Sequence, residues 1–519
     1  MNRRDLIADL LHNKESRWDV IVIGGGATGL GIALDSITRG FRTLLLEQSD
    51  FSKGTSSRST KLVHGGVRYL AQGDLLLVTE ALRERGRMLK NAPFLTDNQE
   101  FIIPVYTTWD VILYSVGLKF YDFLAGKLSL GRSYFLKKTE VLERLPLIKA
   151  DGLKGGIVYH DGQFDDSRMA ITLAGACVEN GGNLLNYFNV TGLLKDENRK
   201  VNGVLAKDLA TGEEYKLLSK LVINATGVFA DEIHKMDDPE AEPTIRPSQG
   251  VHVVLDSSFL QSRSAVMIPE TDDGRVLFVI PWYGKVVAGT TDTSVENVTS
   301  EPKALDEEID FILSTTGKYL NRAPSRSDVL SVFAGLRPLA ASRDNPTTTK
   351  EVSRRHKITL SKSGLLSIIG GKWTSYRKMA EETIDRGIST GYLPKRKCQT
   401  ENFRFYSGEL DSGSDPLRIY GNNAVEIKNM ISKQPELGDL INPDLPYTRA
   451  EIVWICRNEM PLTIEDILAR RTRSLILDAR KSAEAAPVVA GIMAQELGYD
   501  KTWQEDQIME YNKLVLNYL

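Results

Sequence analysis

Residues 19–47 read DVIVIGGGATGLGIALDSITRGFRTLLLE, and this stretch decides the fold of the chain. The run VIVI is apolar throughout, as in a strand that is buried on both faces of a sheet. ATGLGIALDSITRG predicts a helix that ends at Gly40, because glycine commonly follows the last turn of a helix. RTLLLE predicts a second buried strand. Together these elements make a βαβ unit of about 30 residues.

Three glycines of this stretch form the motif G-x-G-x-x-G at the turn between strand and helix. Gly24 permits a tight turn, Gly26 lets the backbone approach a pyrophosphate, and Gly29 lets the helix pack closely on the sheet. The start of a helix also attracts negative charge. Glu47 ends the second strand 18 residues after Gly29, where a carboxylate accepts hydrogen bonds from a ribose diol. The pattern predicts a dinucleotide-binding unit, and alone it favours neither NAD nor FAD.

The composition is that of an ordinary globular protein. The chain has 519 residues, which predicts two to four domains at roughly 100–200 residues each. Hydrophobic residues make up 42% and charged residues 26%, which excludes a disordered or collagen-like chain. The net charge of −3 argues against a nucleic-acid-binding protein that works through a basic face. Three cysteines without pairable spacing exclude a disulfide scaffold and indicate a reducing compartment.

The hydropathy pattern predicts that the chain does not cross a membrane. No segment approaches the roughly 18–20 apolar residues of a spanning helix, and residues 1–18 lack the apolar region of a signal peptide. We therefore expect a cytoplasmic protein, or one that lies on the inner face of the cell membrane. Residues 109–130, WDVILYSVGLKFYDFLAGKLSL, are the candidate for membrane attachment, with Lys119 and Lys127 at the rim of an apolar helix. The alternative is a helix of the protein core, because apolar helix faces are mostly buried.

Two further segments favour FAD over NAD. LVINATG at 221–227 predicts a strand entering a glycine turn. It resembles the second nucleotide-contacting strand of the two-domain flavoproteins related to D-amino-acid and glycine oxidases. GTSSRSTKLVHGGVRYL at 54–70 is rich in small hydroxyl residues and glycines, which could wrap a flavin and its pyrophosphate.

These motifs make a more specific resemblance. Segment 54–70 and GGKWTSYR at 370–377 look like the two signatures of FAD-dependent glycerol-3-phosphate dehydrogenases. EDILARRTR at 465–473 resembles the helical cap domain of that family. Three shorter motifs follow in the family's order: IPW at 280–282, GTTD at 289–292 and GLRPL at 335–339. The similarity covers essentially the whole chain.

The resemblance implies an α/β fold with an all-helical addition. A Rossmann-like FAD-binding domain of the D-amino-acid-oxidase and glycine-oxidase type would be interleaved with a mixed β-sheet substrate domain, and a helical cap would follow. The expected FAD-binding domain comprises residues 1–90 with parts of 150–245 and 350–395. The expected substrate domain comprises 91–150 and 246–350, and the expected helical domain 396–519.

The resemblance also implies a reaction. sn-Glycerol 3-phosphate would be oxidised to dihydroxyacetone phosphate by hydride transfer to flavin N5, and the electrons would pass to a membrane quinone. The substrate phosphate needs fixed positive charge, for which the family match nominates Arg337, Arg354 and Lys372. Arg337 and Lys372 also count among the expected catalytic residues. Arg68 and Tyr69 would contact the glycerol hydroxyls or the phosphate.

Two histidines compete for the role of general base. His252 lies inside an alternating strand pattern, QGVHVVL, that aligns with the family strand facing the flavin. An ordinary histidine pKa near 6.5 suits proton abstraction, so His252 is our first choice. His64 in VHGG is the alternative, and it could instead position the flavin ring.

The cofactor is expected to be bound tightly and without a covalent link, because the first flavin-wrapping loop contains no cysteine. Thr374 and Ser375 would begin a helix whose N-terminus stabilises reduced flavin. The expected cofactor contacts are Gly24, Gly26, Ala27, Thr28, Gly29, Glu47, Thr55, Ser56, Ser57, Ser59, Lys61, His64, Gly65, Gly66, Val190, Ala225, Thr226, Gly227, Gly371, Lys372 and Thr374.

Several alternatives stay open at this stage. An oxidase would pass its electrons to oxygen and make hydrogen peroxide. An amine-oxidising enzyme would carry a carboxylate-binding arginine in place of the Arg–Arg–Lys set. A non-catalytic flavin-binding regulatory protein would bind FAD without reacting. The histidines lack metal-ligand spacing, so no metal site is predicted, and a homodimer is one expectation for the assembly.

Overall fold

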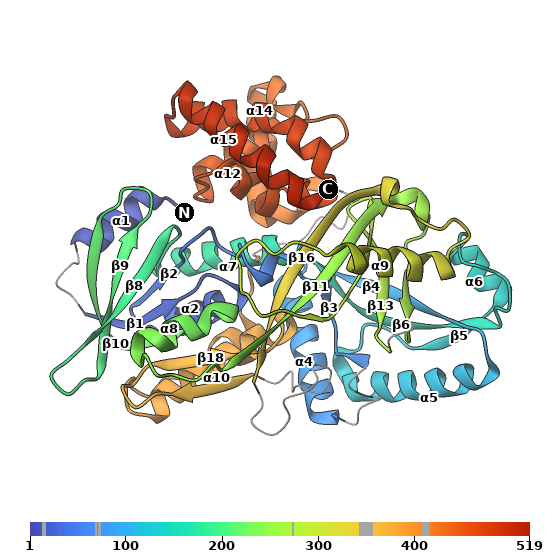
Figure 1. Ribbon diagram of the computed structural model, residues 1–519, viewed down its shortest axis with the longest axis horizontal. Helices are drawn as coiled ribbons and strands as arrows, with labels where there is room; N and C mark the ends of the chain where they lie inside the picture. The colour runs from blue at the N-terminus through green and yellow to red at the C-terminus, as the bar shows by residue number, and fades with distance from the viewer. Residues whose placement is uncertain (13–16, 68–69, 71–73, 272–273, 342–355, 407–414) are drawn as a thin grey trace.

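The computed structural model describes residues 1–12, 17–67, 70, 74–271, 274–341, 356–406 and 415–519. In these ranges the chain forms two β-sheets side by side, and the C-terminal helices lie together on one side of both (Figure 1). The predicted α/β architecture with a helical addition is therefore confirmed.

The first sheet is built around β1 (Trp18–Ile23), the strand that opens the decisive stretch. Its order is β17-β18-β10-β1-β2-β7, and all neighbours from β18 to β7 are parallel. β8 and β9 continue from β10 as an antiparallel ribbon. Long apolar runs form such strands because both faces of a parallel sheet are covered. The other strands are β2 (Thr43–Leu46), β7 (Asn183–Leu185), β8 (Phe188–Lys195), β9 (Val201–Asp208), β10 (Glu214–Asn224), β17 (Lys357–Leu360) and β18 (Leu366–Ile369).

Side chains of β1 point alternately into two core clusters, one on each face of this sheet, and helices cover one of these faces. Val20 and Val22 belong to a core cluster with side chains of α2 (Ala27–Thr38), α7 (Asp166–Glu179) and α10 (Tyr376–Ser389). Ile21 and Ile23 belong to a different cluster on the other face, which includes α1 (Arg3–His12) and the β8–β10 ribbon. Successive strand residues point to opposite faces, so β1 holds both layers together.

The second sheet is mixed and has the order β15-β11-β14-β13-β12-β4-β6-β3, with β16 beside β11 and β5 beside β6. The sequence runs VHVVL, LFVIPW and KVVAG lie in β11, β13 and β14. Its strands are β3 (Leu62–Val63), β4 (Thr96–Val105), β5 (Tyr134–Lys137), β6 (Gly155–Phe164), β11 (Ile245–Asp256), β12 (Ala265–Ile268), β13 (Leu277–Trp282), β14 (Lys285–Gly289), β15 (Thr293–Ser294) and β16 (Val329–Ala340).

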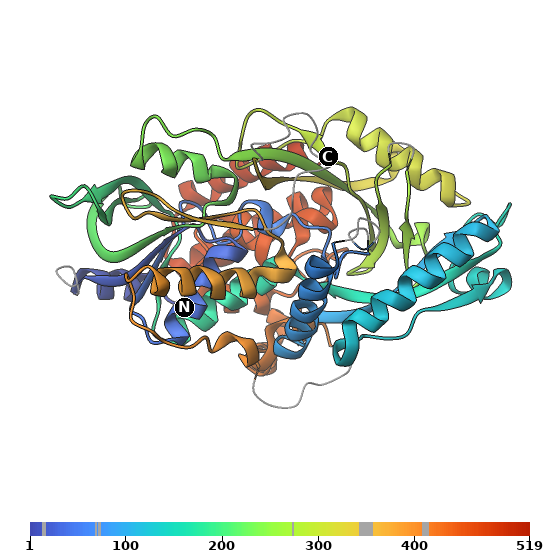
Figure 2. The ribbon, with the colours of Figure 1, turned by 90° about the horizontal axis from the view of Figure 1, so that it is seen from below.

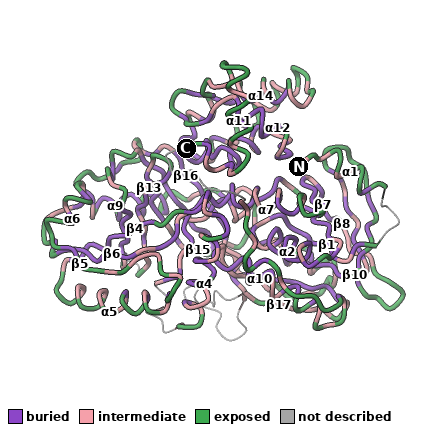
Figure 3. The backbone as a smooth tube through the Cα atoms, turned by 180° about the vertical axis from the view of Figure 1, so that it is seen from behind, coloured by how far each residue is buried: buried purple, intermediate pink, exposed green. Residues whose placement is uncertain are grey.

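Three groups of helices flank this sheet. α9 (Asp306–Tyr319) and α6 (Lys138–Arg144) pack on one face of it, and α4 (Leu75–Asn91) and α5 (Thr108–Ala125) lie below it in the view of Figure 1 (Figures 1 and 2). Burial is concentrated in the sheets and in α2 and α7, whereas most of α5 is exposed or half-buried (Figure 3). The last group comprises α11 (Ala424–Lys433), α12 (Arg449–Asn458), α13 (Ser474–Leu477), α14 (Ala479–Leu497) and α15 (Lys501–Val515).

The expected domain boundaries can be compared with the pairing of the strands. β11 begins at Ile245, beside the expected boundary at 246, and β4 falls within the expected segment 91–150. β3 lies inside the segment 1–90 yet pairs with β6 of the second sheet. The loop that follows β2 therefore crosses from one sheet to the other, and it brings residues of the first segment against the second sheet.

Gly29 gives a test of the close packing between the glycine turn and α2. A Cβ at Gly29 would lie 1.9 Å from the Gly24 carbonyl oxygen, which is backbone and cannot move aside cheaply. We expect Gly29→Ala to lower the free energy of unfolding by about 1–3 kcal/mol and to reduce the amount of the expected dinucleotide retained per chain. Gly175→Ala in α7 is the control, because no atom lies within 4 Å of its added Cβ and alanine favours a helix. Equal dinucleotide content and equal stability of the two variants would contradict this packing argument.

Candidate active site

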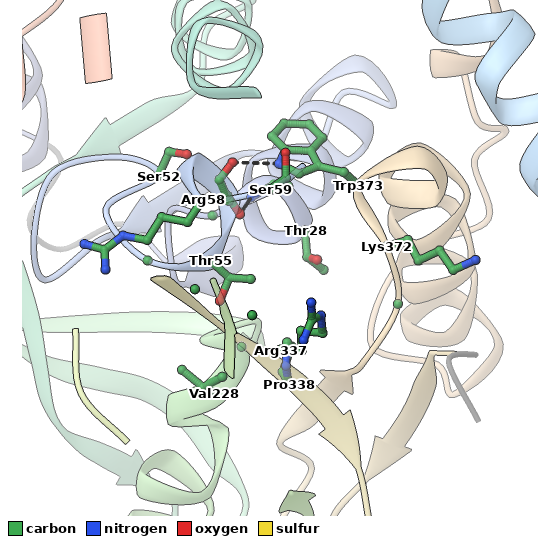
Figure 4. Close-up of a pocket in the computed structure, with 18 of the residues that line it drawn as sticks. Thr28, Ser52, Thr55, Arg58, Ser59, Val228, Arg337, Pro338, Lys372 and Trp373 are labelled. Carbon is green, nitrogen blue, oxygen red and sulfur yellow. Dashed lines mark hydrogen bonds between the residues drawn. The ribbon is translucent and has the colours of Figure 1, made fainter. Parts of the chain in front are cut away.

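A cavity of about 670 Å³ lies where the carboxyl ends of β1 and β10 meet strands β11 and β16 of the second sheet. Gly24 and Ala225 line it from the first sheet, and His252 and Arg337 line it from the second. Ligands of parallel α/β sheets bind beyond the carboxyl ends of the strands, so this is the expected place for one. Figure 4 looks into this cavity.

The glycine turn forms one wall. Gly24 has a φ of 110°, and a Cβ there would lie 2.7 Å from the Ala225 carbonyl oxygen. α2 begins directly after Gly26 without a side-chain cap, and the Ala27 N–H donates to Ser56 Oγ at 2.9 Å. Gly24, Gly26, Ala27 and Thr28 line the cavity, whereas Gly29 packs behind them. An uncapped helix start beside such a turn suits a pyrophosphate.

Glu47 stands at the end of β2, where the motif predicted an acidic residue. Its carboxylate accepts hydrogen bonds from the Gly25 N–H at 2.6 Å and the Ser49 N–H at 2.8 Å, and it lines the cavity. Val190, Ala225, Thr226 and Gly227 line the same region. Phe229 and Met236 also line it, and no sequence motif identified them, because single apolar residues carry no recognisable spacing.

The two signature segments lie next to each other at the cavity. The Trp373 indole N–H donates to the Ser56 carbonyl oxygen at 2.8 Å (Figure 4). Other residues of both segments, all among the expected cofactor contacts, line the cavity: Thr55, Ser56, Ser59, His64, Gly66, Gly371, Lys372 and Thr374. Ser57, Lys61 and Gly65 are not brought to its surface. The Gly65 N–H instead donates to Asp161, and the Ser57 carbonyl accepts from Lys61.

Lys61 is fully buried behind the cavity wall. Its ammonium donates to Asp166 at 2.7 Å and to the Ser57 carbonyl at 2.8 Å, and it lies 4.9 Å from the centre of the Phe333 ring. Burial is the largest influence on this group, and it lowers the pKa of Lys61 to about 7 although Asp166 acts in the other direction. Lys61 therefore holds the loop behind the cavity wall in place. It does not line the cavity, where the sequence predicted a cofactor contact.

His252 lies on β11 with only 2% of its surface exposed. Its ring stacks on Phe333 of the neighbouring strand, with the ring centres 4.8 Å apart. On the other side, a Cβ at Gly289 would lie 2.4 Å from His252 Cδ2, so glycine leaves room for the imidazole. Burial, followed by the positive charges of Lys61 and Arg337, holds the pKa of His252 well below its ordinary value. The imidazole is therefore neutral, the form that can accept a proton, but it is a weaker base than the ordinary pKa near 6.5 would make it.

His252 has a polar partner that sequence reasoning missed. The Thr60 hydroxyl lies 2.9 Å from His252 Nε2, and Thr60 itself lines the cavity. Thr60 stands in the first signature among Ser59, Lys61 and other polar residues. Nothing in the order of the chain indicates that this one reaches β11, about 190 residues later; the pairing depends on the tertiary fold.

The expected phosphate ligands are only partly brought together. Arg337 on β16 donates to the Gln249 and Thr291 carbonyl oxygens and to Thr290 Oγ1, at 2.9–3.2 Å. Lys372 comes from the second signature on another wall, and Figure 4 shows its side chain extending away from Arg337. Arg354, Arg68 and Tyr69 lie outside the described residues.

Comparison with known proteins gives two family matches. Residues 19–377 match the family described as FAD dependent oxidoreductase, and residues 365–504 match the C-terminal domain of alpha-glycerophosphate oxidase. A probable mitochondrial glycerol-3-phosphate dehydrogenase of Caenorhabditis elegans is 40% identical over 98% of this chain and 74% of its own. The mitochondrial glycerol-3-phosphate dehydrogenase of Schizosaccharomyces pombe is 40% identical over 95% of this chain and 86% of its own.

Solved structures agree with this match. Glycerol-3-phosphate dehydrogenase from Bacillus halodurans, solved with FAD, is 29% identical with a TM-score of 0.80 and covers 99% of this chain and 97% of its own. An L-alpha-glycerophosphate oxidase from Mycoplasma pneumoniae with FAD bound is 18% identical with a TM-score of 0.57, over 76% of this chain and 100% of its own, so it supports the fold alone.

The effect of the Lys61 charge on the pKa of His252 can be tested without substrate. Removing the positive charge in Lys61→Met should raise the pKa of His252, because a nearby cation opposes protonation of the imidazole. The pKa should stay below 6.5, since burial remains the larger influence. An NMR titration of histidine side chains measures the change, with the exposed Lys357→Met as control. A His252 pKa that is unchanged or lower in Lys61→Met would contradict the electrostatic account.

Proposed function

The chain belongs to the FAD-dependent glycerol-3-phosphate dehydrogenase family, and from this premise we infer that it oxidises sn-glycerol 3-phosphate to dihydroxyacetone phosphate and passes the electrons to a membrane quinone. FAD is its cofactor. The observation that carries the inference is the match of nearly the whole chain to dehydrogenases at 40% identity, together with a cavity that combines a dinucleotide turn with His252 and Arg337.

The cavity residues fit FAD. Gly24 lies so close to the Ala225 backbone that no Cβ fits there, and the start of α2 offers backbone N–H groups to a pyrophosphate. Glu47 would hold the ribose, and the segment Thr55–Gly66 with Gly371–Thr374 would hold the flavin end. Bound there, FAD accepts the hydride that leaves the substrate carbon.

We assign the substrate-handling roles from charge and position. Arg337 would bind the phosphate, since three carbonyl and hydroxyl contacts already fix its guanidinium. Lys372 and Arg354 would add further positive charge. His252, which lines the cavity from β11, would accept the hydroxyl proton in its neutral form. His64, which lines the cavity from the first signature, would position the flavin.

A quinone acceptor is supported by the apolar part of the cavity. Phe101, Tyr159, Met267, Val276 and Phe278 line it on the side of the second sheet. Val276 and Phe278 pack against the same core cluster as two residues in the first turns of α5, Val111 and Tyr114. An apolar ring could approach the flavin along such a wall. Molecular oxygen is the alternative acceptor, and hydrogen peroxide formation during turnover would identify it.

α5 supplies the surface for membrane contact. In the described ranges, no helix has both the length and the apolar composition needed to cross a bilayer. α5 buries Leu118, Tyr121 and Ala125 in the core, so it contributes to the core along one side. Its exposed large apolar residues are Trp109, Ile112, Leu113, Val116, Phe120 and Phe123. Lys119 and Lys127 are exposed nearby, which is typical of a helix that lies in a membrane interface.

Arg337→Ala tests the phosphate assignment. Losing a charge-assisted contact of about 2–3 kcal/mol should lower kcat/KM for glycerol 3-phosphate by roughly thirty- to hundredfold. The much weaker turnover of glycerol, which has no phosphate, should barely change. Steady-state kinetics with both substrates measures this, with the exposed Arg326→Ala as control. Equal losses for the two substrates would show that Arg337 does not act on the phosphate.

The membrane surface is tested by flotation with anionic liposomes. The wild type should float, with an attraction of about 1 kcal/mol per lysine that weakens as salt is added. Leu113→Glu/Phe120→Glu should remain at the bottom of the gradient. Met509→Glu/Leu516→Glu is the control, because both are exposed large apolar residues near the C-terminus, away from α5. A folded, flavin-containing α5 variant that floats like the wild type would exclude this helix as the anchor.

A further inference from the structure

His252 has a single polar contact in the described part of the chain. Nε2 is 2.9 Å from Thr60 Oγ1, whereas Nδ1 is buried and has no hydrogen-bond partner among the described residues. Phe333 covers one face of the ring, and the strand around Gly289 lies against its Cδ2 edge. A proton that arrives at His252 must therefore arrive at Nε2, and that nitrogen already faces the Thr60 hydroxyl.

Thr60 is the more accessible member of this pair. Its side chain is half-buried and lines the cavity, whereas His252 is almost completely buried. The loop around it is fixed on both sides by one carboxylate. Asp166 accepts from the Ser59 N–H at 3.0 Å, from Ser59 Oγ at 2.7 Å and from Lys61 Nζ at 2.7 Å. The loop thus holds the Thr60 hydroxyl between the cavity and His252 Nε2.

We propose that Thr60 is a catalytic residue that relays the substrate proton to His252. The proposal rests on the proposed function, because it specifies how the substrate hydroxyl loses its proton. The alternative arrangement, with the proton on Nε2, leaves only the sealed Nδ1 as an acceptor, and no hydroxyl in the cavity could reach it.

The steps balance without a further reactant. The substrate O–H bond breaks as its proton moves to Thr60 Oγ1, and the Thr60 proton moves at the same time to His252 Nε2. The C–H bond at the same carbon would break, its hydrogen would leave with both bonding electrons as a hydride, for which bound FAD would be the acceptor, and the carbon–oxygen bond would become a carbonyl. The hydroxyl of Thr60 is restored, and His252 carries the extra proton until it is released.

Rapid anaerobic mixing with glycerol 3-phosphate tests the relay. Thr60→Val keeps the side-chain shape and removes the hydroxyl, so flavin reduction should slow by about 10²-fold. FAD content and the affinity for dihydroxyacetone phosphate should stay unchanged. Thr60→Ser restores the hydroxyl and should recover the rate to within about threefold of the wild type. Reduction of Thr60→Val at the wild-type rate would overturn the relay, whereas failure of the wild type to be reduced would overturn the proposed function itself.

A second measurement uses no variant at position 60 and no turnover. The relay requires neutral His252 to carry its proton on Nδ1, so that Nε2 accepts from Thr60. NMR spectra of protein with 15N-labelled histidine report the tautomer, and His252→Gln identifies its signals among the six histidines. An Nδ1-protonated ring supports the relay. An Nε2-protonated ring would overturn it, even if Thr60→Val were slow or lost its flavin.

Discussion

The carboxylate of Asp166 is the point on which the arrangement of the site depends. It lies fully buried at the start of α7 and accepts hydrogen bonds from Ser59, Lys61 and Arg473. Burial alone would raise the pKa of Asp166, but Lys61 and Arg473 together lower it below the ordinary value. The single carboxylate of Asp166 thereby connects three parts of the protein: α7, the loop with Ser59 and Lys61 that borders the cavity, and the C-terminal domain through Arg473. Removing the Asp166 carboxylate would take from the buried Lys61 and Arg473 the anion that they share, which is far more costly than losing an exposed ion pair.

Further ion pairs extend this connection between the helical domain and the α/β part. Asp50, which follows β2, accepts from Arg470 and Arg471 at 2.5–3.0 Å. Arg168 of α7 forms a two-bond pair with Glu459. Buried charges add little net stability compared with apolar packing, but they accept only partners of correct geometry. The helical domain therefore fixes the position of the loop residues that form the cavity wall, although none of its described residues lines the cavity.

Local patterns predicted more of the fold than of the site. The glycine turn, Glu47 and the apolar strand runs are contiguous in sequence, so their spacing alone indicates a βαβ unit and where its ligand lies. Thr60 could not be paired with His252 because the contact joins two distant segments across the two sheets. Lys61 was expected at the cofactor, since a lysine in a polar loop gives no sign that a buried aspartate will hold it elsewhere. α5 was ambiguous because its pattern is apolar on most sides, and only the packed structure shows which side chains stay exposed.

The central claim is that this cavity holds FAD in reach of a base and a phosphate-binding arginine, so that glycerol 3-phosphate reduces the cofactor directly. The most direct measurement is the visible absorption spectrum of the purified wild-type protein while glycerol 3-phosphate is added without oxygen. The account predicts loss of the oxidised-flavin absorbance, with one dihydroxyacetone phosphate formed for each flavin reduced. A protein that keeps its oxidised-flavin spectrum at saturating glycerol 3-phosphate would contradict the account.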